Sequence, residues 1–221
     1  MQATSTAPGS PIIFSKTWRV AAQFFSYLFH PVFIPSAIAA FLLLLHPINT
    51  LLVPYDIRIR IMAMVVLNTL FFPVLTMLLL WRLKFIQNLY LETMRERIIP
   101  LNVSIIFYFW AFYVGRNLEA IPPSLQQWLL GVFLGSCAAM FTNIFKKISL
   151  HAIGMGGLVA FCAWQQAVDI YWPGWLFPAS LLIAGLVGSS RLIRHAHEPS
   201  EIYIGYLVGA ACQLAGSLIL S

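Results

Sequence analysis

Charge is what this sequence has least of. Only 9% of its 221 residues are charged, whereas about a quarter are charged in a typical soluble domain. Hydrophobic residues make up 60% of the chain. Such a chain has too few polar side chains to cover a water-facing surface, which excludes a soluble globular protein and predicts a surface that faces lipid.

Cysteines and interdomain linkers are also scarce. The three cysteines, Cys137, Cys162 and Cys212, lie within apolar segments without disulfide or metal-ligand spacing, so we expect small buried thiols. The first 15 residues are rich in Ser, Thr, Pro, Gly and Gln and lack the charged region and short apolar core of a cleavable signal. We therefore expect a mobile tail over residues 1–15 and a single transmembrane domain over residues 16–221.

Long apolar runs fill most of the remaining chain. A transmembrane helix needs roughly 20 residues to cross the hydrocarbon core, and it satisfies its own backbone hydrogen bonds there. The sequence holds seven long apolar stretches: Val20–His46, Ile61–Trp81, Leu101–Val114, Ser124–Phe145, Ala152–Trp172, Trp175–Ser190 and Ile202–Leu220. The prediction is an all-α, polytopic transmembrane helical bundle of about six to seven spans. We expect it in the bacterial inner (cytoplasmic) membrane.

The basic residues are divided unevenly between the two sides of such a bundle. If every stretch is a span, ten of the 13 Lys and Arg residues lie on the side of the N-terminus and three on the other. Three loops on the first side hold residues 95–97, 147–151 and 191–201, and neighbouring loops are two spans apart, so all three reach one face. Topology anchoring explains cations there, but not the histidines and the serine at the same depth.

The segment Ser190–Gly209 carries the strongest chemical signal. Arg191 offers a planar, permanently charged fork that suits phosphate oxygens. His197 can act as a nucleophile or a base near neutral pH. Glu201 follows four residues later, on a helical turn that Pro199 is suited to begin. Its carboxylate can therefore reach a ring nitrogen of His197 and fix the tautomer.

The segment Lys147–His151 carries a second set of polar groups. Ser149 is a natural helix N-cap, and the free N–H groups of a helix start favour an anion, to which Ser149 and Lys147 would add. His151 can donate a proton to a departing oxygen. The glycine-rich run over residues 154–157 is typical of close helix packing.

A third set of polar groups precedes the third apolar stretch. Arg95 and Arg97 can supply further phosphate contacts, and Pro100 predicts a helix start. Two other histidines, His30 and His46, each precede a proline near an end of the first stretch. We expect these two to be interface histidines at helix boundaries.

These sets resemble the signature motifs of the type-2 phosphatidic acid phosphatase superfamily, the membrane lipid phosphate phosphatases. The third motif of that family reads Ser-Arg, five residues, His, three residues, Asp. Ser190, Arg191 and His197 match it in type and spacing, and Glu201 stands in place of the aspartate.

The other two motifs of the family are matched more loosely. Ser149 and His151 are similar to the serine and histidine of the second motif, Pro-Ser-Gly-His. The first motif reads Lys, six residues, Arg-Pro. Arg97 is similar to its arginine, with Pro100 displaced by two residues and Tyr90 at the lysine position. Within the second set, Lys147 is a candidate to replace that lysine.

The resemblance implies a metal-independent hydrolase with no cofactor. His197 would attack phosphorus and form a phosphohistidine, Glu201 would orient it, and His151 would protonate the leaving alcohol. The phosphate-binding residues would be Arg191, Ser149, Lys147, Arg97 and Arg95. The four basic residues of this set would stabilise the charge of the transition state without a metal. The implied partners are a membrane lipid phosphate and the bilayer, not a nucleic acid.

Several alternatives stay open beside this hypothesis. The motif departures favour, as runner-up, a catalytically weakened member that binds or translocates anionic lipids; a phosphate-transferring enzyme is a third possibility. A metal site would draw on His195, His197, Glu198 and Glu201. The neighbouring arginines Arg191 and Arg194 argue against it. Without the four candidate site cations the charge count is six to three, which favours a cytoplasmic site face, whereas relatives in the family more often have theirs on the outer face.

Overall fold

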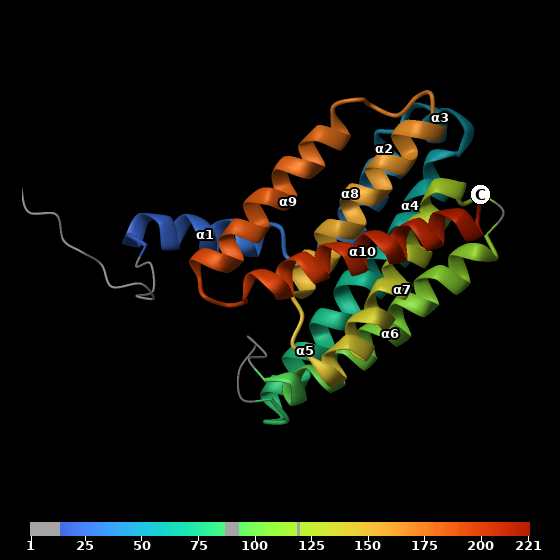
Figure 1. Ribbon diagram of the computed structural model, residues 1–221. Helices are drawn as coiled ribbons and strands as arrows, with labels where there is room; N and C mark the ends of the chain where they lie inside the picture. Colours follow the sequence, from blue (N-terminus) through green and yellow to red (C-terminus); the bar gives the residue numbers. More distant parts are fainter. Residues whose placement is uncertain (1–13, 87–92, 119) are drawn as a thin grey trace, which may run out of the picture.

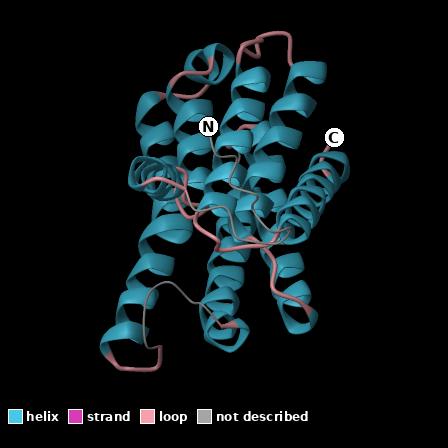
Figure 2. Ribbon diagram, turned by 60° about the vertical axis from the view of Figure 1, so that its left-hand side comes forward, coloured by secondary structure: helices cyan, strands magenta, loops and turns pink. Residues whose placement is uncertain are grey.

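The computed structural model describes residues 14–86, 93–118 and 120–221, so nearly all of the predicted N-terminal tail lies outside the described residues. In this part of the chain all regular structure is helical (Figure 1, Figure 2). The helices in chain order are α1 (Lys16–Leu28), α2 (Ile34–Leu44), α3 (Pro47–Leu52), α4 (Tyr55–Val66), the π-helical turn η1 (Leu67–Phe71), α5 (Phe72–Arg82), α6 (Met94–Arg116), α7 (Pro123–Phe145), α8 (Leu150–Val168), α9 (Leu176–Ile193) and α10 (Pro199–Ile219).

Within the residues that the structure describes, five helical segments are long and apolar enough to cross a membrane. They are Tyr55–Arg82, in which α4, η1 and α5 run on without a break, and α6, α7, α9 and α10. The expected all-α membrane bundle is therefore confirmed, and the chain is an integral membrane protein. The π-helical turn lies next to Pro73, which has no N–H for the regular helical ladder.

Helix α8 lies inside the bundle, packed against α7, α9 and α10. Met155 and Phe161 are fully buried on it. It packs on α10 so closely that a Cβ added at Gly156 would collide with the Tyr206 backbone, and one added at Gly209 would collide with the Ile153 carbonyl. Close packing by the glycines after His151 is thus confirmed, and it fixes the starts of α8 and α10 relative to one another.

The sequence analysis predicted one spanning helix over the first apolar stretch. This prediction is wrong, because the stretch forms two separate helices, α1 and α2. It breaks between α1 and α2 at His30-Pro31. Proline lacks the N–H that would continue the helix and disfavours helical geometry in the residue before it, and hydropathy does not register either effect. In Figure 1, α1 (blue) lies across the end of the bundle where α9 ends and α10 begins.

Helix α2 packs against α4 and α7, and the histidines on either side of it lie near opposite ends of α8. The His30 ring lies beside the His151 ring at the start of α8, with 5.0 Å between their centroids. His46 comes after α2, and its Nε2 lies 3.0 Å from Asp169 Oδ2, directly after the end of α8. Because α1 stays at the first end, the predicted meeting of the three polar loops survives the change in helix count.

Candidate functional site

The turn between α9 and α10 holds the most tightly bonded pair of the site. His197 Nδ1 lies 2.6 Å from Glu201 Oε2, and both side chains are buried. The pair forms because Pro199 occupies the first position of α10, so that Glu201 sits one turn above His197. Glu201 also accepts a capping hydrogen bond of 3.4 Å from the Glu198 N–H, which holds its carboxylate in place. The predicted histidine–carboxylate pair is confirmed.

Burial keeps the His197 ring uncharged. Desolvation lowers the pKa of His197 to about 4, with Arg191 and Arg97 adding to the effect and the Glu201 hydrogen bond opposing it. A carboxylate can only accept, so Nδ1 carries the proton of the neutral ring. The other nitrogen, Nε2, is then left with its lone pair, which is the state that a nucleophile needs.

Two arginines bring positive charge to the same place. Arg191, near the end of α9, donates from Nη1 to Ser26 Oγ over 2.9 Å. Its Nε is buried without a hydrogen-bond partner among the described residues. Arg97 is only 6% exposed and donates from Nη1 to the Ile148 carbonyl over 3.1 Å. The nearby carboxylate of Glu201 offsets one of these two charges, so the cluster keeps an excess of positive charge.

Helix α6 begins at Met94, earlier than the sequence analysis predicted, and so it includes Arg97. Pro100 does not start this helix but lies within it. The start is fixed by a capping box in which the Thr93 side chain accepts from the Glu96 N–H over 3.2 Å and Glu96 accepts in return from the Thr93 N–H over 3.1 Å. Arg97 is therefore a helical residue near the start of α6, and not a loop residue as predicted.

His151 enters the site from the second position of α8. Ser149 caps that helix, accepting from the Ala152 N–H over 3.3 Å, as expected of an N-cap. His151 Nε2 lies 3.0 Å from the Ser26 carbonyl oxygen and 3.4 Å from Ser26 Oγ. Ser26, from α1, therefore joins Arg191 and His151.

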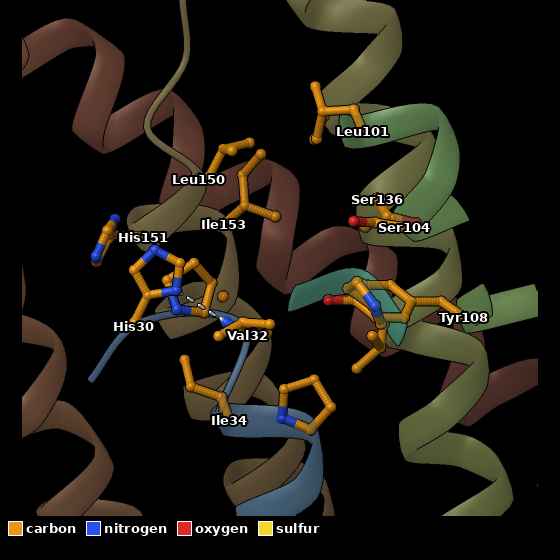
Figure 3. A pocket seen from close by; sticks show the side chains of 18 of the residues that line it. His30, Val32, Ile34, Leu101, Ser104, Tyr108, Ser136, Leu150, His151 and Ile153 are labelled. Atoms are coloured by element: carbon orange, nitrogen blue, oxygen red, sulfur yellow. Dashed lines mark hydrogen bonds between the residues drawn. The ribbon is translucent and has the colours of Figure 1, made fainter. Parts of the chain in front are cut away.

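His197, Arg191, Arg97 and His151 line one cavity of about 430 Å³, whereas Glu201, Ser26 and Ser149 lie outside its lining. Its polar end is formed by five side chains, those of His30, Arg97, His151, Arg191 and His197. Apolar residues form much of the remaining wall. Figure 3 shows His30 and His151 side by side, with Ile34, Leu101 and Ile153 around the space and Ser104, Tyr108 and Ser136 across from the histidines. A cationic end and apolar walls suit an amphipathic anion.

Three predicted phosphate-binding residues lie outside the cavity lining. Ser149 is completely buried and occupied as the α8 cap. Lys147 donates from Nζ to the Ala196 carbonyl over 3.3 Å, so it supports the loop that carries His197. Arg95 is exposed on the first turn of α6. The structure thus gathers Arg97, Arg191, His151 and His197 around the cavity and keeps the other three apart from it.

Two site residues were missed by the sequence analysis. His30 does lie at a helix boundary, as expected, but it lines the cavity instead of only marking an interface. Ser26 lies inside the first apolar stretch, Val20–His46, and nothing in the sequence sets it apart from the residues around it. The His-Pro dipeptide was the available signal for His30, because a break in the helix there would turn the preceding residue inward. No comparable signal marks Ser26.

The alternative metal set does not assemble. Of its members, His197 and Glu201 form the hydrogen-bonded pair described above. His195 is exposed, with a left-handed backbone of φ 50°. Within residues 14–86, 93–118 and 120–221, no three His, Cys, Asp or Glu side chains are grouped as metal ligands.

Comparison of the chain with protein-family models, with curated proteins and with solved structures finds no match. Its fold and its site define it as an all-helical membrane protein with a partly apolar cavity whose polar end is cationic.

Proposed function

We propose that this protein is a membrane-embedded hydrolase that removes phosphate from a lipid phosphate or pyrophosphate through a phosphohistidine intermediate. The observation that carries the proposal is that one cavity is lined by a neutral, carboxylate-paired His197, a second histidine, His151, and two guanidinium groups, those of Arg97 and Arg191. These residues come from segments up to 100 residues apart, Arg97 to His197. They bring together the nucleophile, the acid and the anion-binding groups that phosphoryl transfer requires.

The reaction begins with attack by His197. Its Nε2 lone pair forms a bond to phosphorus while the bond from phosphorus to the lipid oxygen breaks, and the released electron pair stays on that oxygen. Burial and the positive charge of Arg191 hold the pKa of His151 well below its usual value, so the ring is neutral until substrate binds. In the proposed reaction the bound phosphate raises that pKa by its negative charge and His151 takes up a proton, which it then gives to the oxygen as the lipid alcohol leaves. A pyrophosphate substrate would instead release a lipid monophosphate.

Water completes the cycle. His151 accepts a proton from the attacking water, whose oxygen bonds to phosphorus as the phosphorus–Nε2 bond breaks. Inorganic phosphate leaves and His197 returns to its neutral form. In both halves Glu201 accepts from Nδ1 and stabilises the positive charge on the ring, while Arg97 and Arg191 stabilise the equatorial oxygens.

The cavity walls support a lipid as the substrate. A phosphate held by Arg97 and Arg191 would place the attached chain against side chains such as Ile34, Leu101 and Ile153. Diacyl, isoprenoid and sphingoid chains all meet this requirement. As part of the same proposal, the protein acts in the cytoplasmic (inner) membrane of a bacterium.

The decisive experiment measures phosphate release by the purified protein from phosphatidate, an isoprenyl pyrophosphate and phosphatidylglycerophosphate. His197→Asn keeps a hydrogen-bond donor near Glu201 but removes Nε2, so it should abolish release, as should His197→Ala. The matched control is His195→Asn on the same turn, where asparagine tolerates the left-handed backbone. Radiolabelled phosphate from the substrate should appear on the wild-type protein as an acid-labile adduct. Retained turnover in His197→Asn excludes the mechanism.

A specific observation keeps binding or translocation without hydrolysis as the second candidate. The hydroxyl of Ser149 caps α8 and does not line the cavity, so a phosphate there has one donor fewer than the motif resemblance implies. In that case anionic lipid binding would survive His151→Ala and His197→Ala and fall with Arg191→Ala. Binding to nanodiscs with and without phosphatidate separates the two functions.

A further inference from the structure

His30 is the one histidine of the cavity to which neither the motif resemblance nor the proposed reaction gives a role. It follows α1 and lies beside Pro31, in the turn that leads to α2. Its ring lines the cavity and meets the His151 ring nearly at right angles, with an interplanar angle of 83°. Figure 3 shows both rings at the same edge of the space.

The backbone fixes which nitrogen of His30 carries a proton. The Val32 N–H donates to His30 Nδ1 over 3.3 Å, the contact drawn as a dashed line in Figure 3. A nitrogen that accepts this hydrogen bond has its lone pair in use, so the proton of the neutral ring lies on Nε2. His30 therefore differs from His197, in which Nδ1 holds the proton and Nε2 the lone pair.

The surroundings keep His30 uncharged as well. Burial lowers the pKa of His30 to about 4, and the positive charge of Arg191 adds to this effect. At neutral pH the ring is a hydrogen-bond donor of fixed direction that adds no further cation to a site already holding two guanidinium groups. Such a donor helps to bind an anion without increasing the repulsion between the site cations.

We propose that His30 is a third phosphate-binding residue of this cavity, an uncharged one whose Nε2–H donates to a phosphoryl oxygen held by Arg97 and Arg191. The inference rests on the proposed phosphate site. It goes beyond that site because it gives a binding role to a residue in the turn between α1 and α2, outside all three polar loops. The residue binds substrate through one defined atom, and the tautomer needed is the one that Val32 imposes.

Two amide substitutions test which ring nitrogen matters. Asparagine at position 30 reaches only to the place of Nδ1, whereas glutamine reaches to the place of Nε2 and can present an N–H there. Losing a hydrogen bond to a charged phosphate should lower kcat/KM of His30→Asn by about 10- to 100-fold, mostly through KM. His30→Gln should recover most of that loss, and His195→Asn should match the wild type. Equal activity of His30→Asn and the wild type, or equal loss in the asparagine and glutamine variants, overturns the inference.

A binding measurement separates this inference from the proposed hydrolysis. Orthovanadate and inorganic phosphate can be titrated into detergent-purified wild type, His30→Asn and His30→Gln, followed by calorimetry. About tenfold weaker binding in the asparagine variant alone supports the role of His30 even if the wild type hydrolyses none of the lipids. Equal affinities overturn it even if hydrolysis is confirmed.

The tautomer can also be read directly. Nitrogen-15 spectra of histidine-labelled protein, with the His30 signals assigned by their loss in His30→Asn, should show a neutral ring protonated at Nε2 at pH 7. A ring protonated at Nδ1 overturns the inference whatever the activity, because Nε2 would then have no proton to donate.

Discussion

Replacing Glu201 by glutamine removes the negative charge from the His197 pair while keeping the size of the side chain. In the wild type the buried carboxylate accepts from Nδ1 over 2.6 Å and so leaves the ring lone pair on Nε2, the atom that attacks in the proposed reaction. An amide can turn its NH₂ group toward Nδ1, which would move the ring proton to Nε2 and block the attack. Even when the amide oxygen faces the ring, the positive charge that forms there loses its counter-charge.

The size of the effect follows from the kind of hydrogen bond that is lost. A hydrogen bond to a charged group contributes about 1.5–3 kcal/mol, and each 1.36 kcal/mol changes a rate about tenfold. We therefore expect Glu201→Gln to lower kcat by about 10- to 150-fold. Glu201→Asp, which keeps the charge and has the residue type of the motif it resembles, should retain more activity than Glu201→Gln. Asp56→Asn, which removes the charge of an exposed acid in α4, is the control.

The pH dependence supplies an independent check on the same pair. Burial lowers the pKa of His197 to about 4, and Glu201 opposes that shift. Without the carboxylate the pKa falls further, so the acid limb of kcat/KM, where the nucleophile becomes protonated, should move to lower pH. Phosphate release should be measured between pH 3.5 and 8 in parallel for the wild type and the three variants. An acid limb that moves to higher pH, or a Glu201→Gln rate within twofold of the wild type, refutes the reasoning.

Two further substitutions test the cation cluster and the helix packing. Arg191→Lys keeps the charge but loses the fork and its Nε, so KM should rise by about 10-fold or more, while Arg95→Lys outside the cavity leaves KM unchanged; equal KM values contradict this reading. Gly209→Ala pushes a methyl group against the Ile153 carbonyl and should lower the melting temperature by roughly 2–12 °C, whereas Gly185→Ala, with open space around it, should not. Equal melting temperatures of these two alanine variants would show that α8 and α10 part at little cost.

The sequence predicted the site best where the contact is local. His197 and Glu201 are four residues apart, so a single helical turn brings them together once Pro199 starts the helix. The meeting of Arg97, His151 and Arg191 was predictable for a coarser reason, since an even number of crossings separates their loops. The number of crossings determines at which end of the bundle these residues lie, but not the distances between their side chains.

The role of Ser26 and the bounds of the helices were not predicted, because hydropathy along the sequence does not show tertiary contacts or helix caps. Ser26 reaches Arg191 across 165 residues of sequence, and only the break after α1 turns it toward the site. Hydropathy merged α1 and α2 because the residues around the break are apolar on both sides. Pro100 predicted the wrong start for α6. The capping box formed by Thr93 and Glu96 sets the start of this helix instead.

If the proposed phosphate site is correct, the hydrogen bond between Ser26 and Arg191 makes ligand binding an exchange of one hydrogen bond for another. Because Nη1 of Arg191 already donates to the serine hydroxyl, an arriving anion gains there only the difference between two hydrogen bonds. Free orthophosphate has little else to offset the cost of entering, while a molecule with a hydrocarbon chain also removes apolar surface from water, at about 25 cal/mol per Å². Under the proposed function, Ser26 would therefore weaken the binding of inorganic phosphate, and a lipid would be retained mainly through burial of its hydrocarbon chain.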